Sequence, residues 1–255
     1  MITAGIDSGS RAVKTVIYNN ETGKILASAV KDQGVEQSKI AENVLAEALN
    51  KAGISRDHIH KIIATGYGRN GIDFADSRIT EITCHAKGVS TLNPGVRTII
   101  DIGGQDSKVI HLDEKSHVFD FVMNDRCAAG TGRFMEIVID RLECSMSQVR
   151  ALVEKSRNPA TISSMCVVFA ETEIIGLLAA GTLPEDILAG VQSSIATRLS
   201  SMAGRFFKSP LVFTGGMALV DGMKEALEKA LGTQISTSDT PQFTGALGAA
   251  VIASE

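Results

Sequence analysis

The sequence has no apolar run of about 18 residues, the length that a helix needs to cross a membrane. It also has no excess of positive charge, since 25 Lys and Arg face 29 Asp and Glu, a formal net charge of −4. Proteins that bind nucleic acid usually carry a basic stripe, so the composition argues against DNA or RNA partners. The first residues form an apolar segment without a basic region or a cleavage site, and we therefore expect a cytoplasmic protein.

The four cysteines include no C-x₂-C pair, and no part of the chain is of low complexity or resembles a linker. In a reducing cytoplasm we expect these cysteines to remain thiols rather than to form structural disulfides. The chain has 255 residues, of which 44% are hydrophobic. This is enough for one large domain or two moderate domains with a sizeable core.

A short glycine-containing pattern occurs twice. The first copy is Gly5-Ile6-Asp7-Ser8-Gly9-Ser10 with Lys14, and the second is Ile100-Asp101-Ile102-Gly103-Gly104-Gln105 with Lys108. In each copy an Asp ends an apolar strand, a Gly follows two residues later, and a Lys follows seven residues later. Gly lets backbone N–H groups approach an anion, and the Asp supplies a carboxylate for hydrated Mg²⁺. Two such hairpins facing each other predict a cleft that binds a nucleotide polyphosphate from both sides.

The rest of the chain alternates apolar strand patterns with amphipathic helix patterns, which is typical of an α/β fold. We expect a strand meander at residues 4–6, 15–18 and 24–30, short strands at 61–65 and 211–214, and a helix at 38–52. Further helices are expected at 131–142, 167–180, 185–207 and 245–253. Another helix is expected to begin after Asp221, which would cap it. Asn93-Pro94-Gly95 breaks the pattern and predicts the boundary between two related halves, residues 1–95 and 96–244, with helix 245–255 packing back on the first half.

The order of three glycine turns, at residues 5–10, 101–105 and 214–216, resembles that of the actin-like ATPase superfamily, which includes sugar kinases, Hsp70 and actin. The resemblance covers the whole chain and implies two duplicated ribonuclease H-like domains with a nucleotide cleft between them. It implies that Asp7 and Asp101 position Mg²⁺ and the attacking water, and that Gln105 lies near the γ-phosphate of ATP. The superfamily often has a second hydroxyl residue where this chain has Arg11.

The same resemblance assigns further residues to the nucleotide, ATP or ADP. Those expected to contact the phosphates are Ser10, Arg11, Ala12, Val13, Lys14, Gly103 and Gly104. Those expected on the adenosine side are Gly215 and Gly216, and Gln242 is expected to bind the nucleotide as well.

Two cysteines each stand just before a helix pattern, in Asn124-Asp125-Arg126-Cys127-Ala128-Ala129-Gly130-Thr131-Gly132-Arg133-Phe134 and in Ser163-Ser164-Met165-Cys166-Val167-Val168-Phe169-Ala170-Glu171. A helix N-terminus carries partial positive charge, which favours thiolates. A lone cysteine there is more often a small hydrophobe, but two in the same context favour a metal–thiolate site.

These segments, with Gly66-Tyr67-Gly68-Arg69-Asn70 and the second hairpin, resemble the activators (component A) of 2-hydroxyacyl-CoA dehydratases and the related ATPase subunits of benzoyl-CoA reductase. The resemblance implies a homodimer that shares one [4Fe–4S] cluster, with Cys127 and Cys166 of each chain as ligands. A cubane cluster needs four thiolates, and two-fold symmetry supplies the second pair.

The remaining candidates have simpler interpretations. Cys84 and Cys144 lack the helix-start context and are expected to be structural, although a cluster bound by all four cysteines of one chain is conceivable. His85 is expected to be a hydrogen-bonded, partly buried histidine rather than a metal ligand. Glu171 and Glu173 are expected to be solvated or interfacial, with access to the cluster as a secondary role.

The resemblance therefore implies an ATPase coupled to electron transfer. Ferredoxin or flavodoxin would reduce the cluster, and ATP hydrolysis would drive the electron at low potential to an iron–sulfur dehydratase or reductase. One alternative is a small-molecule kinase of the same fold, although a chain of 255 residues leaves little room for the usual inserted substrate-binding subdomains. A second alternative is a non-catalytic nucleotide-sensing or assembly protein. Both alternatives predict a protein without iron.

Overall fold

The chain folds into two compact units, described here from a computed structural model that covers residues 1–163, 166–204 and 207–255. Unit 1 comprises Met1–Arg97, Ile110–Asp120 and Ser238–Glu255. Unit 2 comprises Thr98–Val109 and Phe121–Thr237. Each of the two sheets has five strands.

The first sheet belongs to unit 1 and has the strand order β3-β2-β1-β4-β5. Its strands are β1 (Ile2–Ser8), β2 (Ala12–Asn19), β3 (Lys24–Asp32), β4 (Ile59–Thr65) and β5 (Ser77–Arg78). β1, β2 and β3 form an antiparallel meander, whereas β4 runs parallel to β1. The register places Asp7 on β1 directly opposite Lys14 on β2 and beside Thr65 on β4.

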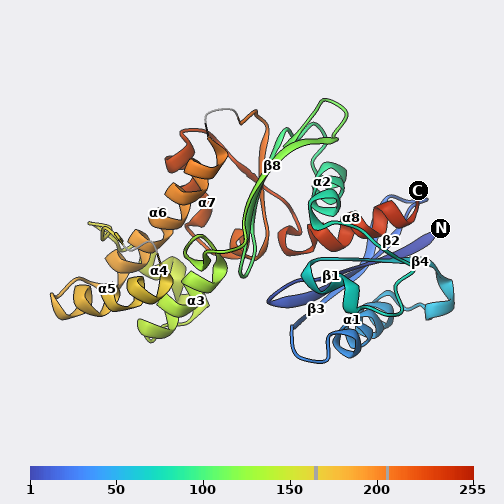
Figure 1. Ribbon diagram of the computed structural model, residues 1–255, viewed down its shortest axis with the longest axis horizontal. Coiled ribbons are helices and arrows are strands. Elements are labelled where there is room, and N and C mark those ends of the chain that lie inside the picture. Colours follow the sequence, from blue (N-terminus) through green and yellow to red (C-terminus); the bar gives the residue numbers. More distant parts are fainter. Residues whose placement is uncertain (164–165, 205–206) are drawn as a thin grey trace. The chain divides into compact units, whose positions relative to one another are not determined.

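Three helices cover the two faces of this sheet (Figure 1). The helices are α1 (Gln37–Ala52), α2 (Glu81–Leu92) and α8 (Thr244–Ala253). The apolar stripe of α1 packs on one face, and the helix ends at Gly53 in the left-handed conformation. α8 packs on the other face beside α2, where a Cβ added at Gly248 would lie only 1.7 Å from the carbonyl oxygen of Cys84. This crossing therefore requires glycine.

The second sheet has the strand order β10-β9-β6-β7-β8. Its strands are β6 (Thr98–Ile102), β7 (Ser107–Leu112), β8 (Val118–Asn124), β9 (Leu211–Thr214) and β10 (Ser236–Thr237). β9 runs parallel to β6, and the register places Asp101 beside Thr214. The position of Asp101 in its sheet thus repeats that of Asp7 beside Thr65 in the first.

The helices of unit 2 pack around one apolar core that includes Ile100, Phe134 and Phe213. The helices are α3 (Gly132–Arg141), α4 (Val149–Val153), α5 (Val167–Ala179), α6 (Pro184–Ala203) and α7 (Met223–Leu231). Six short 3₁₀ helices complete the described secondary structure, at Arg56–His58, Tyr67–Gly71, Ala128–Gly130, Met146–Gln148, Gly216–Leu219 and Pro241–Phe243. None of the helices among the described residues is long and apolar enough to cross a membrane.

Most predicted helices and strands agree with the observed ones to within a few residues, and the larger differences have physical reasons. The helix predicted at 185–207 is described only to Ala203, and residues 205–206 lie outside the described chain. Asp221 does not cap α7, because Gly222 occupies the N-cap with φ 83° and no side chain caps the helix. The carboxylate of Asp221 instead lies 3.9 Å from the Arg150 guanidinium.

Candidate functional site

The turn between β1 and β2 carries the first group of predicted phosphate-binding residues. Asp7 is buried, and its Oδ2 lies 3.2 Å from Lys14 Nζ. The turn is closed by a hydrogen bond from Gly9 N to the carbonyl oxygen of Ala12 at 3.1 Å. Asp7 Oδ1 is also buried and has no hydrogen-bond partner among the described residues. A buried carboxylate oxygen in this state fits a cation ligand, since a buried polar atom is normally satisfied.

The other residues of this turn differ in what they can offer to a phosphate. Ser10 is half-buried, and Arg11 is exposed, with its guanidinium 3.4 Å from Asp32. The side chain of Val13 is fully buried in the core of unit 1, so only its backbone faces the turn.

The turn between β6 and β7 carries the second group. Lys108 is fully buried and donates hydrogen bonds to Asp101 Oδ2 at 3.1 Å and to Asp106 Oδ2 at 2.9 Å. The glycine turn at Gly103 and Gly104 is tied to the start of α3. Gly103 O accepts a hydrogen bond from Gly132 N at 2.9 Å, and Gly104 O accepts one from Arg133 N at 2.8 Å.

Gln105 is exposed at the tip of the same turn. It is therefore accessible, as a residue near a γ-phosphate would have to be. Gln242, also predicted to bind the nucleotide, lies in the 3₁₀ helix Pro241–Phe243 of unit 1 and is half-buried.

A glycine follows the parallel strand in each unit with the same backbone conformation. Gly66 has φ 86° after β4, and Gly215 has φ 87° after β9. A Cβ at Gly66 would lie 2.5 Å from Asp7 Oδ1, and one at Gly215 would lie 2.8 Å from Asp101 Oδ1. Each glycine therefore brings the backbone against the carboxylate of its own hairpin. Sequence analysis did not pair these glycines, although Thr65-Gly66 and Thr214-Gly215 follow similar apolar strands.

Unit 2 contains a hollow of about 570 Å³ next to the 3₁₀ helix that follows Gly215. Its lining comes from α4, α6, α7 and the segment from Ala218 to Gly222. Gln192 on α6 donates a hydrogen bond to the carbonyl oxygen of Asp221 at 2.8 Å and so fixes one wall. The lining residues are far apart in sequence and share no motif, and sequence analysis missed them.

Cys127 and Cys166 both occupy N-cap positions. Cys127, half-buried, precedes the 3₁₀ helix that leads into α3, and Cys166, exposed, precedes α5. The backbone of Cys127 is held by Asn124, whose Nδ2 donates to Cys127 O at 2.7 Å and whose Oδ1 accepts from Cys127 N at 3.1 Å. Ser164 and Met165, which precede Cys166, lie outside the described residues. No disulfide joins the four cysteines, all of which lie in the described part of the chain.

The two glutamates on α5 have structural partners that the sequence did not predict. Glu171 forms an ion pair with Arg141, which links α5 to α3. Glu173 Oε1 accepts hydrogen bonds from Ser163 N at 2.9 Å and from Ser163 Oγ at 2.7 Å. Both side chains thus also hold segments next to the cysteine positions.

The two other cysteines, Cys84 and Cys144, have raised thiol pKa values. Cys84 is fully buried, and burial raises the pKa of its thiol to about 12. Burial also raises the pKa of the half-buried Cys144 thiol, whose Sγ lies 3.7 Å from the carbonyl oxygen of Ile139. Both are therefore protonated thiols at neutral pH and poor metal ligands.

Each sheet thus carries an Asp–Lys hairpin and a parallel strand that ends in a glycine turn, the arrangement of the actin-like ATPase and sugar-kinase fold. A glucokinase of the ROK family from Streptomyces griseus shares this fold at 14% identity, with a TM-score of 0.58 over 100% of this chain and 99% of that one.

More specifically, residues 4–253 match the model of the BadF/BadG/BcrA/BcrD ATPase family, and the chain belongs to that family. It is 44% identical to the (R)-2-hydroxyglutaryl-CoA dehydratase activating ATPase of Acidaminococcus fermentans, over 98% of this chain and 96% of the relative. It is also similar to the solved activator of the 2-hydroxyisocaproyl-CoA dehydratase from Clostridium difficile with bound ADPNP. That similarity has 42% identity and a TM-score of 0.94, and it covers 99% of this chain and 94% of that one.

Proposed function

We propose that this protein is an ATP-dependent reductive activator. It would hydrolyse ATP to drive low-potential electron transfer to a 2-hydroxyacyl-CoA dehydratase or a related CoA-ester reductase. The observation that carries the proposal is the presence of two cysteines at helix starts in a chain that also has both Asp–Lys hairpins. The named relatives, which activate dehydratases, support it over a small-molecule kinase or a nucleotide sensor.

Two domains would bind the nucleotide, and each contributes one hairpin. The first is residues 1–95 with the C-terminal helix, and the second is residues 96–244. Asp7 and Asp101 would position Mg²⁺ and the attacking water, and Gln105 would face the γ-phosphate. The buried Asp7 Oδ1 fits the role of metal ligand, since it lacks a hydrogen-bond partner among the described residues. The exposed Arg11 would release its ion pair with Asp32 and bind phosphate.

The hollow beside the 3₁₀ helix Gly216–Leu219 would hold the adenosine. Its volume of about 570 Å³ lies within the range typical of small-molecule sites, roughly 300–1,000 Å³. Gly215 and Gly216 would then contact the nucleotide through their backbone, as the superfamily resemblance implies.

For the redox group, Cys127 and Cys166 would supply two thiolates, and a second copy of the chain would supply two more. Their N-cap positions and partial exposure fit a shared anionic [4Fe–4S] cluster. When bound, this cluster would supply one-electron transfer to the partner enzyme, and ferredoxin or flavodoxin would be the donor. A thiolate-bound cluster needs a reducing compartment, so we assign the protein to the cytoplasm.

The coupling between the two sites would run through α3. Gly103 and Gly104, at the proposed phosphate turn, accept hydrogen bonds from Gly132 and Arg133, at the start of the helix that follows Cys127. Arg141 at the other end of α3 pairs with Glu171 on the helix that follows Cys166. A shift of the phosphate turn on nucleotide binding would thus reach both cysteine-bearing segments.

The test is the iron content of protein purified without oxygen. We expect one cluster of four iron atoms per two chains. Cys127→Ser and Cys166→Ser should each lose the iron, because the cluster loses symmetric ligands. The matched controls Cys84→Ser and Cys144→Ser should retain it. One cluster per chain, measured by iron analysis with light-scattering mass, or iron-free wild-type protein would contradict the proposal.

A further inference from the structure

Asn124 is the last residue of β8, and its side chain bonds a single residue further along the chain, Cys127. Its Nδ2 donates to Cys127 O at 2.7 Å, and its Oδ1 accepts from Cys127 N at 3.1 Å. One side-chain amide thus bonds both backbone groups of the same cysteine and closes the step from strand to cysteine into a ring. Asn124 is half-buried, so both bonds are partly shielded from water.

Few side chains can form this pair of bonds. An asparagine amide carries a donor and an acceptor on one terminal group, whereas an ionised aspartate only accepts. Asparagine is also short enough to bond backbone groups two or three residues ahead. Because the amide is neutral, it adds no negative charge beside a thiolate. The residue type at position 124 therefore matters for the conformation of Cys127.

The residue that follows Cys127 is held separately. Ala128 O accepts hydrogen bonds from Thr131 N at 3.1 Å and from Thr131 Oγ1 at 2.7 Å, and Thr131 is fully buried. A Cβ added at Gly130 would lie 3.5 Å from Asn124 Nδ2, so the amide also packs against the 3₁₀ helix that follows the cysteine. Cys127 therefore lies between two fixed points, Asn124 before it and Ala128 after it.

The segment before Cys166 is held in a less direct way. Ser163, three residues before that cysteine, donates from its N and its Oγ to Glu173 Oε1 at 2.9 Å and 2.7 Å. These bonds fix a residue ahead of the cysteine, whereas Asn124 bonds the cysteine itself. Of these side chains, Asn124 acts most directly on a proposed cluster ligand.

On the basis of the proposed function, we infer that Asn124 is a positioning residue for the iron–sulfur cluster. It holds the backbone of Cys127 in place before the thiolate binds iron. A backbone that is already fixed loses little conformational freedom on binding, which favours the bound state. Replacing a residue that orients a metal ligand typically lowers metal affinity by about 10–100-fold. Because two chains share the cluster, each replacement at position 124 acts on two of its four ligands.

The measurement is the rate at which an iron chelator removes iron from full-length protein purified without oxygen. Asn124→Ala should raise this rate by about 10–100-fold. The electron paramagnetic resonance spectrum of the reduced cluster should also change, because the two Cys127 ligands are no longer fixed. Asn124→Ser keeps a hydroxyl that can form one of the two bonds, so it should give an intermediate rate. It also provides a second variant if the alanine variant fails to fold.

Asn19→Ala is the matched control. Asn19 is the last residue of β2, is half-buried, and accepts hydrogen bonds through Oδ1 from Glu21 N at 2.9 Å and from Thr22 N at 3.4 Å. It therefore resembles Asn124 in residue type, burial and place in its strand, but it belongs to unit 1 and bonds no cysteine. This control should lose iron at the wild-type rate.

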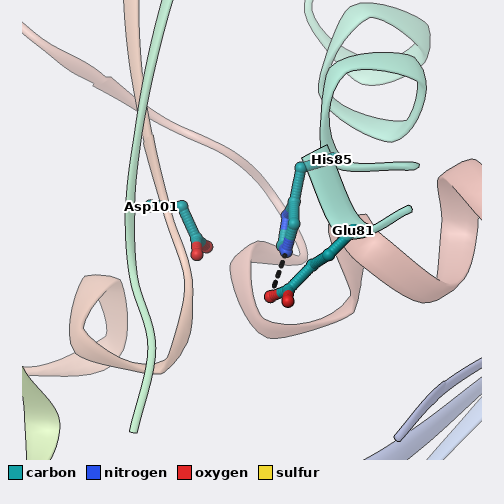
Figure 2. A group of neighbouring side chains, drawn as sticks. All are labelled: Glu81, His85 and Asp101. Atoms are coloured by element: carbon teal, nitrogen blue, oxygen red, sulfur yellow. Dashed lines mark ion pairs between the residues drawn. The ribbon is translucent and has the colours of Figure 1, made fainter. Parts of the chain in front are cut away.

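A second control removes a more buried polar contact. At the start of α2, Glu81 Oε1 lies 3.5 Å from His85 Nε2, and the side chain of Glu81 is 17% exposed (Figure 2). His85 Nδ1 lies 3.0 Å from Thr244 Oγ1 on α8, so the pair links two helices of unit 1. Glu81→Ala should lower the melting temperature but leave the rate of iron loss unchanged, which separates a loss of stability from a loss of positioning.

The outcomes distinguish Asn124 from the cluster itself. Wild-type protein with four iron atoms per two chains, together with a wild-type rate of iron loss in Asn124→Ala, would overturn the role of Asn124 and leave the proposed function intact. A serine variant that loses iron as fast as the alanine variant would also overturn that role, as would equally fast loss in either control. Iron-free wild-type protein would overturn both proposals. Asn124→Ala protein that is purified without iron at an unchanged melting temperature would support the role of Asn124.

Discussion

The two Asp–Lys hairpins share a sequence pattern but differ in their electrostatic surroundings. In unit 1, Lys14 is 20% exposed and pairs with the carboxylate of Asp7. In unit 2, Lys108 is fully buried between two carboxylates, those of Asp101 and Asp106. Breaking a buried pair costs about 3–5 kcal/mol, and the loss is smaller where one partner keeps contact with water. Lys14 can therefore exchange Asp7 for a phosphate more readily than Lys108 can leave its carboxylates, and Lys108 serves to hold the second hairpin together.

The largest expected effect separates the two lysines. Lys108→Met should lower the free energy of unfolding by about 3–5 kcal/mol, because it leaves two buried carboxylates without their shared ammonium group. Lys14→Met should lower it by less, because the lysine that it removes is partly exposed, and it should weaken ATP binding as well. Urea denaturation followed by circular dichroism measures the free energy of unfolding of both variants. Equal losses of stability in the two variants would show that the difference in burial has no energetic consequence.

The two aspartates should matter equally for hydrolysis but unequally for stability. Asp7→Asn and Asp101→Asn should each reduce steady-state ATP hydrolysis by about 100-fold or more, because each removes a carboxylate that orders metal and water. Only Asp101→Asn should also destabilise the fold, since Asp101 is one of two partners of Lys108.

Asp106→Asn is the control for these aspartate variants. It removes the other partner of Lys108 and should cost stability while largely preserving hydrolysis. Wild-type hydrolysis rates in both aspartate variants, Asp7→Asn and Asp101→Asn, would argue against a role of the hairpins in binding phosphate.

The last comparison concerns the paired glycines. Gly66→Ala and Gly215→Ala should each lower the free energy of unfolding by at least about 1–3 kcal/mol, because alanine rarely adopts φ near 86–87°. The added Cβ would also lie 2.5 Å from Ser8 O and 2.4 Å from Ile102 O, respectively. Gly216→Ala is the matched control, since nothing lies within 4 Å of an added Cβ there and its φ is not positive. Calorimetric unfolding of the three variants provides the test. A large loss of stability in only one of the two variants, Gly66→Ala or Gly215→Ala, would mean that the two turns are not structurally equivalent.

Local patterns predicted much of this structure. The 3.6-residue periodicity placed α1 and α5 almost to the residue, and the repeated glycine pattern predicted both hairpins. The ion pairs Asp7–Lys14 and Asp101–Lys108 within them were not predicted. One prediction failed at the local level. Asp221 has the side chain of a helix cap, but the following Gly222 takes the left-handed conformation and becomes the N-cap itself.

The sequence by itself determined the hairpins, the helices and the placement of Cys127 and Cys166 at helix starts, because each depends on residues close together in the chain. Only the tertiary structure decided which side chains meet across elements. It brought Arg141 to Glu171, Glu173 to Ser163, and His85 to a glycine that it shares with Asp7. The physical reason is that helix and strand periods are encoded locally. Contacts between distant segments depend on register and on close approaches that glycine allows, and no spacing in the sequence records them.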